Sequence, residues 1–544
     1  EYYSRRLERL WRDGVAKPAC PFPLGENSLY IAYYASAEMG CHLAFDWDLP
    51  NSLLDLFCEF RCLTNGLPLP AGNGLLGALA AYGLAHISFV EKAEMIQLAL
   101  RGGPYSAEEQ VALLDYCQTD VDALVALLPE MAPKIPIDHA LIRGHYMKAV
   151  ARMQFVGSPV DLRLLERLRA DWEFIQDDLI AEVDKDFGVY EGRTFKTELF
   201  ARYLLRNQIA WPRLPSGNLD LKDDTFRVMA KVHTNLSPLR ELRHSLGQMR
   251  LNKFEVGADG RNRTMLSAFG GKTGRNQPSS NKFIFGSSVW LRSLIKPAEG
   301  WGIAYIDWSQ QEFGIAAALS GDQVMQQAYA SGDPYLEFAK LAGAVPADAT
   351  KKSHSQQRAL YKQTVLAVNY GMGEDSLAER IQQPVIVAKD LLRKHRQTFK
   401  TFWHWSDGSV DYALLHKKLW TVFGWQIQVA GKINARSLAN FLMQANGAEM
   451  LRIACILMTE AGIRVCAPVH DAVLIEAPLE ELDDRVQQAQ ELMTEASRQV
   501  LGDFELTTDA DIYRYPERYR DEERGGAFWD KVMGLLPENL LIMD

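Results

Sequence analysis

The sequence predicts a multidomain protein of the α+β class, and three observations support that prediction. The chain has 544 residues, too many for one hydrophobic core, so roughly two to four domains are expected. Apolar runs that suit strands lie at 302–306 and 465–475, whereas segments 335–420 and 434–460 have the apolar spacing of helices. Apolar residues make up 47% of the chain and charged residues 24%, which is ordinary for a globular protein.

Membrane and secreted classes are not favoured. The sequence contains no apolar run of about 18 residues, the length that a membrane-spanning helix needs, and no basic-then-apolar leader. Its seven cysteines are odd in number and include no Cys-x-x-Cys pair, which argues against a disulfide framework or a zinc cluster. We therefore expect a protein of a reducing, cytoplasmic compartment that does not contact membranes.

The N-terminal quarter mixes strand-like and helical patterns. Within residues 1–135, short apolar runs alternate with helical stretches at Leu53–Phe60 and Ala107–Leu128. Three prolines predict a connector at 129–136.

The next part of the chain is helical and becomes basic. Helical spacing over 140–206 is interrupted at Gly157-Ser158-Pro159, and 225–250 is again helical. From Arg240 to Lys296 there are eleven Lys and Arg residues and three carboxylates, although the whole chain has a net charge of −10. This segment is a candidate surface for phosphate contact, and a solvated charged helix and loop is the alternative.

A glycine-rich stretch lies inside this basic segment. Residues 268–282 read Ala-Phe-Gly-Gly-Lys-Thr-Gly-Arg-Asn-Gln-Pro-Ser-Ser-Asn-Lys. Glycine allows close backbone approach, and main-chain amides can bond to phosphates or bases. Such contacts are one interpretation of the stretch, and a plain loop is the other.

The C-terminal half carries two aspartates at predicted strand ends. One strand is expected to end at Asp307 and to be followed by a helix over 313–319. A hairpin is predicted at 421–429, and the later strand–turn–strand places His470 and Asp471 at its turn. Mg²⁺ prefers oxygen ligands and is usually held by one or two carboxylates and substrate phosphates. A lone aspartate at a strand end is more often a cap or turn residue, so the metal-site prediction depends on the combination.

The helical segment between the aspartates completes this combination. Arg358, Lys362, Leu366 and Tyr370 follow one another at intervals of four, so they form one stripe of a helix. The cationic start of the stripe fits a triphosphate, and its apolar and aromatic end fits a base and sugar. Two carboxylates beside a cationic helix suit two-metal phosphoryl transfer, whereas an amphipathic helix with a charged end is the plain alternative.

Together these residues resemble family A DNA polymerases, the class that includes bacterial DNA polymerase I and its Klenow fragment. Asp307-Trp-Ser-Gln-Gln-Glu312 resembles motif A, Asp-Tyr-Ser-Gln-Ile-Glu, and Val469-His470-Asp471 resembles motif C, Val-His-Asp-Glu. The stripe and the glycine after it resemble motif B, Arg-x₃-Lys-x₃-Phe/Tyr-x₃-Tyr-Gly. Three further segments resemble the start of the thumb, the loop that contacts the duplex and the minor-groove helix: Gly157–Asp161, Thr273-Gly274-Arg275, and Arg436, Asn440 and Gln444. The motifs occur in the family's order across residues 140–544.

The resemblance implies a right-hand polymerase with an N-terminal α/β ribonuclease H-like 3′–5′ exonuclease domain. We expect the exonuclease-like domain at 1–135, the thumb at 136–288, the fingers at 336–429, and a palm divided between 289–335 and 430–544. It also implies a monomer that binds primer–template DNA and dNTPs in a bacterial or phage-infected cell.

Roles follow from the same resemblance. Asp307 and Asp471 are expected to hold two Mg²⁺ ions, for which Mn²⁺ can substitute, and Lys362 to protonate the leaving pyrophosphate. Glu312 is expected to crowd the sugar 2′ position and so to select deoxyribose. The expected nucleotide-binding residues are Arg358, Lys362, Leu366, Tyr370, Glu312 and Gln310. The expected DNA-binding residues are Arg275, Arg436, Asn440, Gln444 and His470. Arg436, Asn440 and Gln444 are expected to contact hydrogen-bond acceptors in the minor groove, which all correct base pairs share.

Four positions depart from the family pattern. Leu366 replaces an aromatic residue, which predicts weaker planar packing at the incoming sugar, and leucine here occurs among phage-type members. Ala472 replaces the glutamate that follows the motif C aspartate. Gln311 replaces an apolar residue and Pro468 a glutamine. Because both principal aspartates remain, we expect activity to survive, with altered rate or fidelity.

The N-terminal region resembles an incomplete proofreading domain. Tyr116-x₃-Asp120 resembles the family's last exonuclease motif, Glu38 lies where the middle motif has an aspartate, and Asp55 follows at a fitting distance. The first motif, Asp-x-Glu, does not occur between Glu1 and Glu38. We therefore expect no proofreading unless that motif lies upstream of Glu1; plain helix-surface roles for Tyr116 and Asp120 are the alternative.

The sequence thus predicts a template-directed DNA polymerase that acts in replication or repair. One rival is a polymerase-fold DNA-binding module without catalysis, against which the paired acids speak, since a binder does not need them. The other rival is a 3′–5′ exonuclease, which depends on the missing motif.

Overall fold

A computed structural model describes residues 19–536, apart from short gaps at 85–88, 249–250, 252–253 and 432–433. The chain forms two compact units. The first comprises the chain up to Val156 together with Leu266–Gln277 and Ala304–Asp511. The second comprises Gly157–Met265, Pro278–Ile303 and the chain from Ile512 onward. The fourfold division into exonuclease-like, thumb, palm and fingers regions remains a prediction.

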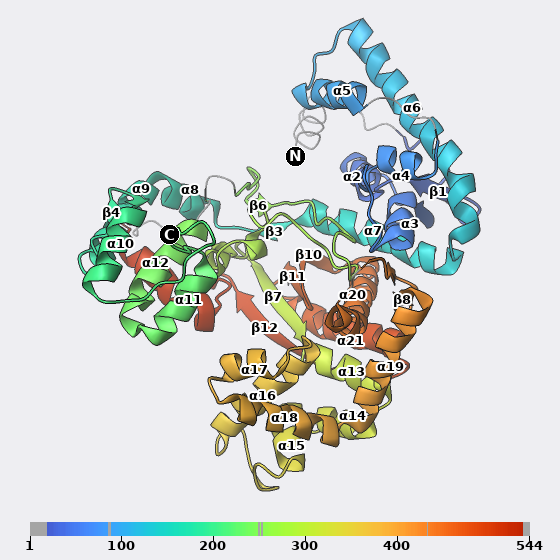
Figure 1. The fold of residues 1–544 in the computed structure, drawn as a ribbon. Coiled ribbons are helices and arrows are strands. Elements are labelled where there is room, and N and C mark those ends of the chain that lie inside the picture. The colour runs from blue at the N-terminus through green and yellow to red at the C-terminus, as the bar shows by residue number, and fades with distance from the viewer. Residues whose placement is uncertain (1–18, 85–88, 249–250, 252–253, 432–433, 537–544) are drawn as a thin grey trace. The chain divides into compact units, whose positions relative to one another are not determined.

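A four-stranded sheet with the order β10-β11-β7-β12 is central to the first unit (Figure 1). Its strands are β10 (Arg464–Val469), β11 (Ala472–Pro478), β7 (Trp301–Trp308) and β12 (Thr508–Arg514). Strands β10 and β11 are antiparallel, with Val469 opposite Ala472 across a tight turn. The predictions of a strand ending near Asp307 and of a turn at His470-Asp471 are confirmed.

Helices α7 (Ile137–Val156), α20 (Ala435–Glu460) and α21 (Leu482–Leu501) pack against strands of this sheet, and α13 (Gln311–Ser320) packs against α20 and α21. From Phe441 onward α20 is buried on almost every side, as expected of a helix with apolar residues all round. The Trp308 indole N–H donates to the carbonyl oxygen of Met493 at 3.2 Å, which joins the end of β7 to α21. The predicted helices at 313–319 and 434–460 are thereby confirmed.

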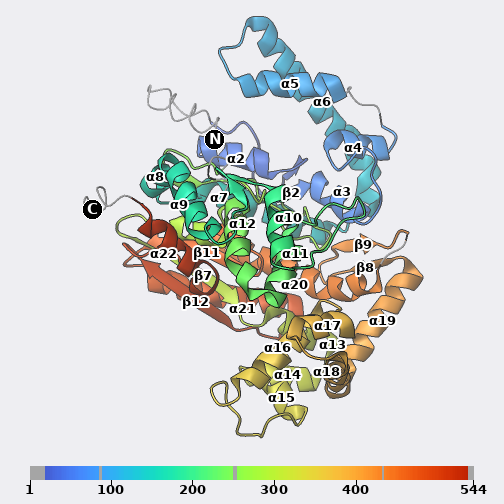
Figure 2. The ribbon, with the colours of Figure 1, turned by 60° about the vertical axis from the view of Figure 1, so that its left-hand side comes forward.

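A group of helices follows α13 and is drawn in yellow and orange in Figure 2. Its core is aromatic, because the Phe338 ring lies 4.8 Å from Tyr361 and 5.2 Å from Phe399, centroid to centroid. The helices are α14 (Gln323–Ala330), α15 (Pro334–Leu341), α16 (Ser355–Asn369), α17 (Glu374–Ile381), α18 (Val385–Thr398) and α19 (Lys400–His416). The hairpin that follows pairs β8 (Lys418–Trp420) with β9 (Gln426–Gln428). The predicted hairpin at 421–429 therefore exists, but it begins earlier, and 421–425 form its turn.

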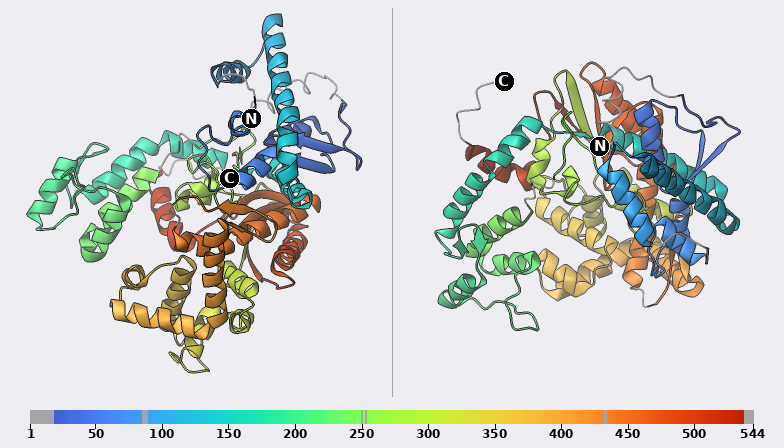
Figure 3. Two further views of the ribbon diagram at one scale, coloured as in Figure 1. Left: turned by 45° about the vertical axis from the view of Figure 1, so that its right-hand side comes forward. Right: turned by 90° about the horizontal axis from the view of Figure 1, so that it is seen from above.

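The N-terminal part of the first unit holds a short parallel pair of strands, β1 (Leu29–Ala32) and β2 (Ser52–Asp55). Its helices are α2 (Ser36–Phe45), α3 (Leu56–Thr64), α4 (Leu75–Ala81), α5 (Phe89–Arg101), α6 (Ala107–Met131) and α7 (Ile137–Val156), in blue to cyan in Figure 3. The prediction of one helical stretch over Leu53–Phe60 is wrong in its first half. Asp55 ends β2 and is the N-cap residue of α3, so the side-chain period changes there from that of a strand to that of a helix.

The connector predicted at 129–136 is shorter than expected. Helix α6 continues through Pro129 to Met131, and a 3₁₀ turn, η1 (Ala132–Lys134), leads into α7. Pro129 is close to the helix end, where the loss of one N–H donor matters less than in a helix interior.

The second unit is mostly helical. Its helices are α8 (Leu162–Ala170), α9 (Trp172–Asp184), α10 (Thr197–Arg206), α11 (Asp223–Val232), α12 (Ser237–Gln248) and α22 (Ala527–Gly534). It also has two small antiparallel strand pairs. These are β3 (Ser158–Pro159) with β6 (Arg261–Asn262), and β4 (Tyr190–Glu191) with β5 (Thr194–Phe195). An aromatic cluster that includes Phe200 and Phe226 forms one core. In neither unit does a described helix have both the length and the apolar character needed to cross a membrane.

Candidate active site

The two aspartates singled out in the sequence lie side by side in the first unit. Asp307 is near the end of β7, and Asp471 is in the turn between β10 and β11, the strand beside β7. The main-chain N–H of Trp308 donates to the carbonyl oxygen of Asp471 at 3.4 Å. Two carboxylates separated by more than 160 residues of sequence are therefore brought together at the ends of two neighbouring central strands.

Both carboxylates are harder to ionise than in water. Burial, followed by the negative charges of Asp471, Asp509 and Asp511, raises the pKa of Asp307 to about 6. Burial also raises the pKa of Asp471, against which the Arg275 and His470 side chains act in the opposite direction. Closely spaced acids that resist ionisation are the arrangement that a bound cation stabilises.

Asp509 and Asp511 were missed in the sequence. They are two apart on β12, so both side chains are on one face of that strand, and both are exposed. The Ser309 hydroxyl, two residues after Asp307, donates a hydrogen bond to the Asp509 carboxylate. The Asp-x-Asp alternation in a strand is a signal that could have found them.

The carboxylate oxygens of Asp307 and Asp471 suit a hard divalent cation that also binds a substrate. Among the residues that the structure describes, no three His, Cys, Asp or Glu side chains form a group able to hold a metal ion. Asp307 and Asp471 would thus supply only part of a coordination shell. Mg²⁺ in such a setting takes its remaining ligands from water and substrate phosphates.

The predicted cationic stripe lies along α16. Arg358 and Leu366 are partly exposed, and Lys362 and Tyr370 are exposed. The opposite side of the helix is buried and includes Thr364 and Val365. The helix therefore presents the stripe to solvent, with Tyr370 as its C-cap residue.

Arg358 has a resident carboxylate partner. Its guanidinium is paired with Asp333, the N-cap residue of α15. The Tyr335 ring lies beneath both cations of the stripe, 5.6 Å from the Arg358 guanidinium carbon and 5.8 Å from the Lys362 nitrogen. Neither Asp333 nor Tyr335 was identified from the sequence, because each belongs to another helix and to no motif.

Glu312 is on the first turn of α13, beside the end of α16. The Asn369 side chain hydrogen-bonds to it, and burial raises its pKa while Arg275 acts to lower it. The negative charge of Glu312 in turn raises the pKa of Tyr370. Gln310 precedes this turn in a left-handed conformation, with φ of +48°. Glu312 and Tyr370 are thus neighbours, as a nucleotide site requires.

The predicted DNA-contacting residues come from two elements and a turn. Arg436, Asn440 and Gln444 lie on one stripe of α20, on which Arg436 is exposed and the other two are partly exposed. The Oδ1 atom of Asn440 and the Nε atom of Arg275 are buried and have no hydrogen-bond partner among the described residues. His470 is exposed, with φ of +57°. Unpartnered polar atoms beside the acids suit a polar ligand.

The cations of the basic segment 240–296 are divided between the two units. Lys272 and Arg275 belong to the first unit, whereas most of the other cations belong to the second. Arg263 pairs with Asp259 at 2.6 Å, and Lys282 pairs with Glu255 at 2.8 Å. Arg250 and Lys253 lie outside the described residues. Some of the cations that the sequence suggested for phosphate contact are therefore paired with nearby carboxylates.

The exonuclease-like residues are brought near one another but are otherwise engaged. Burial, with the negative charges of Asp55 and Asp120, raises the pKa of Glu38 to about 7, although a main-chain hydrogen bond acts to lower it. The Lys92 ammonium pairs with Asp120 at 2.8 Å and lies 5.4 Å from the centre of the Tyr116 ring. The buried Asp55 carboxylate accepts hydrogen bonds from four main-chain N–H groups, those of Tyr34, Ala35, Phe57 and Cys58.

Three of the departures from the family pattern are in buried positions. Ala472 is fully buried, so a glutamate side chain has no room there without rearrangement. Pro468 is on β10, an edge strand of the sheet, where a missing N–H donor is tolerated. Gln311 is buried, and a Cβ atom at Gly447 would lie 2.8 Å from its Oε1 atom, so the glycine makes room for the amide.

Comparisons with known proteins agree with these motifs. The family model for DNA polymerase family A matches residues 276–513. A DNA polymerase I of Chloroflexus aurantiacus is 21% identical over 386 residues, 65% of this chain and 41% of that protein. The thermostable DNA polymerase I of Thermus aquaticus is 25% identical over 217 residues, 37% of this chain and 26% of that protein. The chain thus spans well under two thirds of either relative.

A solved structure gives the fold. The polymerase domain of Pol1 from M. smegmatis, in complex with DNA primer–template and dNTP, superposes with a TM-score of 0.69 at 19% identity. The match covers 92% of this chain and 86% of that one. The predicted polymerase fold of mixed helix and sheet is thereby confirmed. With the match at 276–513, these findings show that the chain is similar to DNA polymerase family A in that part of its sequence and to a polymerase domain in its fold.

Proposed function

We propose that this chain is a template-directed DNA polymerase that adds dNTPs to a primer 3′-hydroxyl in replication or repair. One observation carries the proposal. Asp307 and Asp471 adjoin one another at the ends of two neighbouring strands, in the same unit as the cationic stripe of α16. Neighbouring carboxylates beside a row of cations match the demands of nucleotidyl transfer.

In this mechanism Asp307 and Asp471 hold divalent metal, with Mg²⁺ as the natural ion and Mn²⁺ as a substitute. The metal supplies activation of the primer hydroxyl and charge neutralisation of the phosphates. Arg358 and Lys362 bind the triphosphate, and Lys362, which is exposed and has no acidic partner within the described residues, is the proton donor to the leaving group.

The remaining assignments concern selection. Glu312 excludes a 2′-hydroxyl, and Leu366 and Tyr370 pack against the incoming nucleotide. Arg275, Arg436, Asn440, Gln444 and His470 hold the primer–template. Helix α16 swings toward the acids when a correct nucleotide binds.

We also propose that the N-terminal region derives from a 3′–5′ exonuclease domain and does not cleave DNA. Asp55 has its oxygen atoms occupied by main-chain donors, and Lys92 provides a cation to Asp120. A bound metal would have to displace these partners. Primer shortening in the absence of dNTPs would contradict this part of the proposal.

The central test is extension of a labelled primer on a DNA template with Mg²⁺ and dNTPs. Template-matched extension is expected from the parent and from Asp348→Asn, an exposed aspartate in a loop. Asp471→Asn is expected to abolish it while leaving binding of primer–template in place. A folded parent that binds DNA but extends no primer would point to the non-catalytic binding module instead.

A further inference from the structure

The loop that carries Arg275 has an unusual set of hydrogen-bond partners. We call Leu266–Gln277 the Arg275 loop. Four of its main-chain carbonyl groups accept hydrogen bonds from side chains distant in sequence: those of Phe269, Gly270, Lys272 and Gly274. Loops usually run over the surface and leave many such groups to water. Here the course of the main chain is fixed from several sides.

Helix α3 of the N-terminal region supplies part of this fixation. Arg61 donates to Phe269 O at 2.9 Å and to Gly270 O at 2.8 Å through its Nη2 atom. The Asn65 amide donates to Lys272 O at 2.6 Å and to Gln426 O at 2.7 Å. The end of α3 thus joins the Arg275 loop to strand β9.

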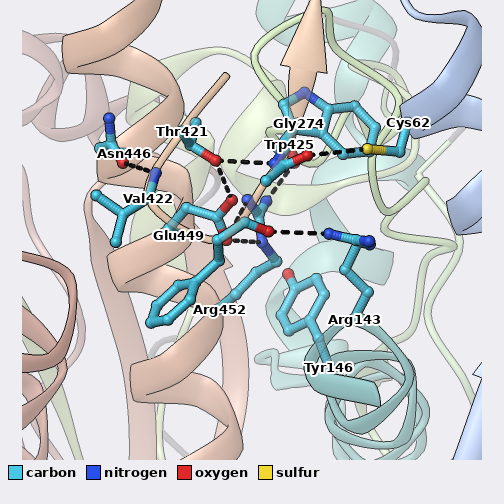
Figure 4. Close-up of polar contacts among 12 residues, drawn as sticks. Cys62, Arg143, Tyr146, Gly274, Thr421, Val422, Trp425, Asn446, Glu449 and Arg452 are labelled. Carbon is cyan, nitrogen blue, oxygen red and sulfur yellow. Dashed lines mark hydrogen bonds and ion pairs between the residues drawn. The ribbon is translucent and has the colours of Figure 1, made fainter. Parts of the chain in front are cut away.

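Helix α20 and the β8–β9 turn supply the rest (Figure 4). Arg452 donates to Gly274 O at 2.8 Å and pairs with Glu449 at 2.8 Å, and both side chains are about 2% exposed. Glu449 also accepts the Thr421 hydroxyl at 2.7 Å. The Trp425 indole donates to Lys272 O at 3.0 Å. A buried charge that is paired and hydrogen-bonded to its surroundings holds its geometry firmly.

Aromatic packing fills the space under the loop. Phe269 is fully buried, with φ of +57°, so its backbone stays in a costly conformation only because its surroundings hold it. Its ring lies 5.1 Å from that of Trp425 and 5.7 Å from that of Tyr146, centroid to centroid. The Arg452 guanidinium lies 4.9 Å from the centre of the Phe269 ring. The loop is therefore a packed element.

Arg275 is a partly exposed side chain of this packed loop. Its charge acts on Glu312 and on Asp471, two carboxylates of the proposed site. Its Nε atom has no partner among the described residues. A donor held in place before its ligand arrives binds at a lower ordering cost than one on a mobile loop.

We propose that Arg61 and Asn65, in the N-terminal region, are positioning residues for Arg275. They hold the main chain of the Arg275 loop so that the guanidinium faces the primer–template and the acids. The nuclease-like region thereby serves the polymerase site through structure, whatever its own chemistry. The inference rests on the proposed function, under which Arg275 touches DNA.

The test compares Arg61→Ala, Asn65→Ala and the charge-retaining Arg61→Lys in the full chain. Arg101→Ala is the matched control, because Arg101 makes an equally close bidentate pair with Glu109 in the same region but does not touch the loop. Amide hydrogen exchange across 266–277, without DNA, is expected to speed up in both alanine variants and to stay unchanged in the control. Arg61→Lys is expected to be intermediate, since a single ammonium cannot reproduce the fork.

The decisive measurement is the Kd for primer–template in a double-mutant cycle of Arg61→Ala and Arg275→Ala. Arg61→Ala is expected to raise this Kd roughly 10-fold in the parent and not at all in an Arg275→Ala background. Full additivity, or unchanged exchange in the loop, would overturn the inference. Asn65→Ala provides the same cycle if Arg61→Ala does not fold. A parent that extends no primer would refute the proposed function alone, because exchange and DNA binding remain readable.

Discussion

Asp307 is held in surroundings that oppose its ionisation. Its pKa rises from an ordinary 3.8 to about 6, because the side chain is partly buried and three other aspartates are near. The folded protein therefore binds this proton more tightly than the unfolded chain does. Stability from this group falls as the pH rises from about 3.8 to about 6, and the full penalty is present at neutral pH.

Replacement of this carboxylate by an amide should stabilise the protein and inactivate it together. Asp307→Asn is expected to raise the free energy of unfolding by about 1 kcal/mol at pH 7.5, after allowance for solvent screening, and to abolish primer extension. The gain should shrink toward pH 4, where the parent aspartate is protonated. Urea unfolding at the two pH values measures this, with Asp348→Asn as control. A loss of stability at both pH values would show that the carboxylate is structural.

Glu312 permits a test that separates size from charge. Its side chain is next to Asn369 and Tyr370, where a sugar would pack. Glu312→Ala is expected to raise ribonucleotide incorporation roughly 10-fold or more relative to dNTP incorporation, because it opens space at the 2′ position. Glu312→Gln keeps the volume and should keep most of the discrimination. The measurement is the ratio of kcat/KM for dNTP to kcat/KM for rNTP in each variant. An equal loss of this discrimination in Glu312→Ala and Glu312→Gln would show that the charge of Glu312, and not its size, selects the sugar.

At the scale of elements, the end of α16 and the start of α20 meet at one glycine. Gly371 has φ of +61°, and a Cβ atom there would lie 2.9 Å from the Cβ of Arg436. Gly371→Ala is therefore expected to cost about 2 kcal/mol of stability and to weaken primer–template binding through Arg436. Gly343 has φ of +68° with no atom near its missing Cβ, so Gly343→Ala is the control for backbone strain. Chemical denaturation and DNA titration should show larger losses of stability and of DNA affinity for Gly371→Ala than for Gly343→Ala. Equal losses in the two variants would show that the α16–α20 contact is not the cause.

The sequence predicted the elements that carry a strong local pattern. The strand before Asp307, the turn at His470-Asp471 and the stripe on α16 all follow from period and spacing, and the structure has each of them. The error at Leu53–Phe60 has a local cause, since the chain changes from strand to helix at Asp55 inside one apolar run. Periodicity alone does not separate a short strand from a helix.

The parts of the site that were missed depend on contacts between distant segments. Asp333 and Tyr335 acquire their role only because α15 packs against α16. The Arg61 bonds to the Arg275 loop join residues more than 200 positions apart, and no short motif encodes such a contact. Local sequence predicts which residues can do chemistry, whereas the partners that hold them are set by tertiary packing.

At the scale of the whole molecule, the N-terminal region is built into the first unit. Glu59 on α3 forms a bidentate pair with Arg143 on α7, at 2.6 and 2.7 Å, and both side chains are almost fully buried. Arg143 also donates to Phe423 O at 3.0 Å. Buried ion pairs of this kind contribute little net stability when intact, but the loss of one partner leaves a charge buried alone.

Removal of residues 1–135 should therefore destabilise what remains. The truncated chain loses Glu59, and the uncompensated Arg143 is expected to cost about 3–5 kcal/mol. Thermal unfolding followed by circular dichroism, on the 136–544 fragment and the full chain, measures the loss. Arg143→Met in the fragment removes the unpaired charge and is expected to restore part of it. A fragment as stable as the full chain would show that the region is dispensable for folding.

The pairing of Arg358 with Asp333 has a consequence for turnover. A triphosphate that binds this arginine exchanges one anionic partner for another, so the net gain in binding is smaller than that of a free guanidinium. The same carboxylate is at hand when the diphosphate leaving group departs, and it can reclaim the arginine at once. Under the proposed function, a resident competitor of this kind would weaken substrate capture and speed product release.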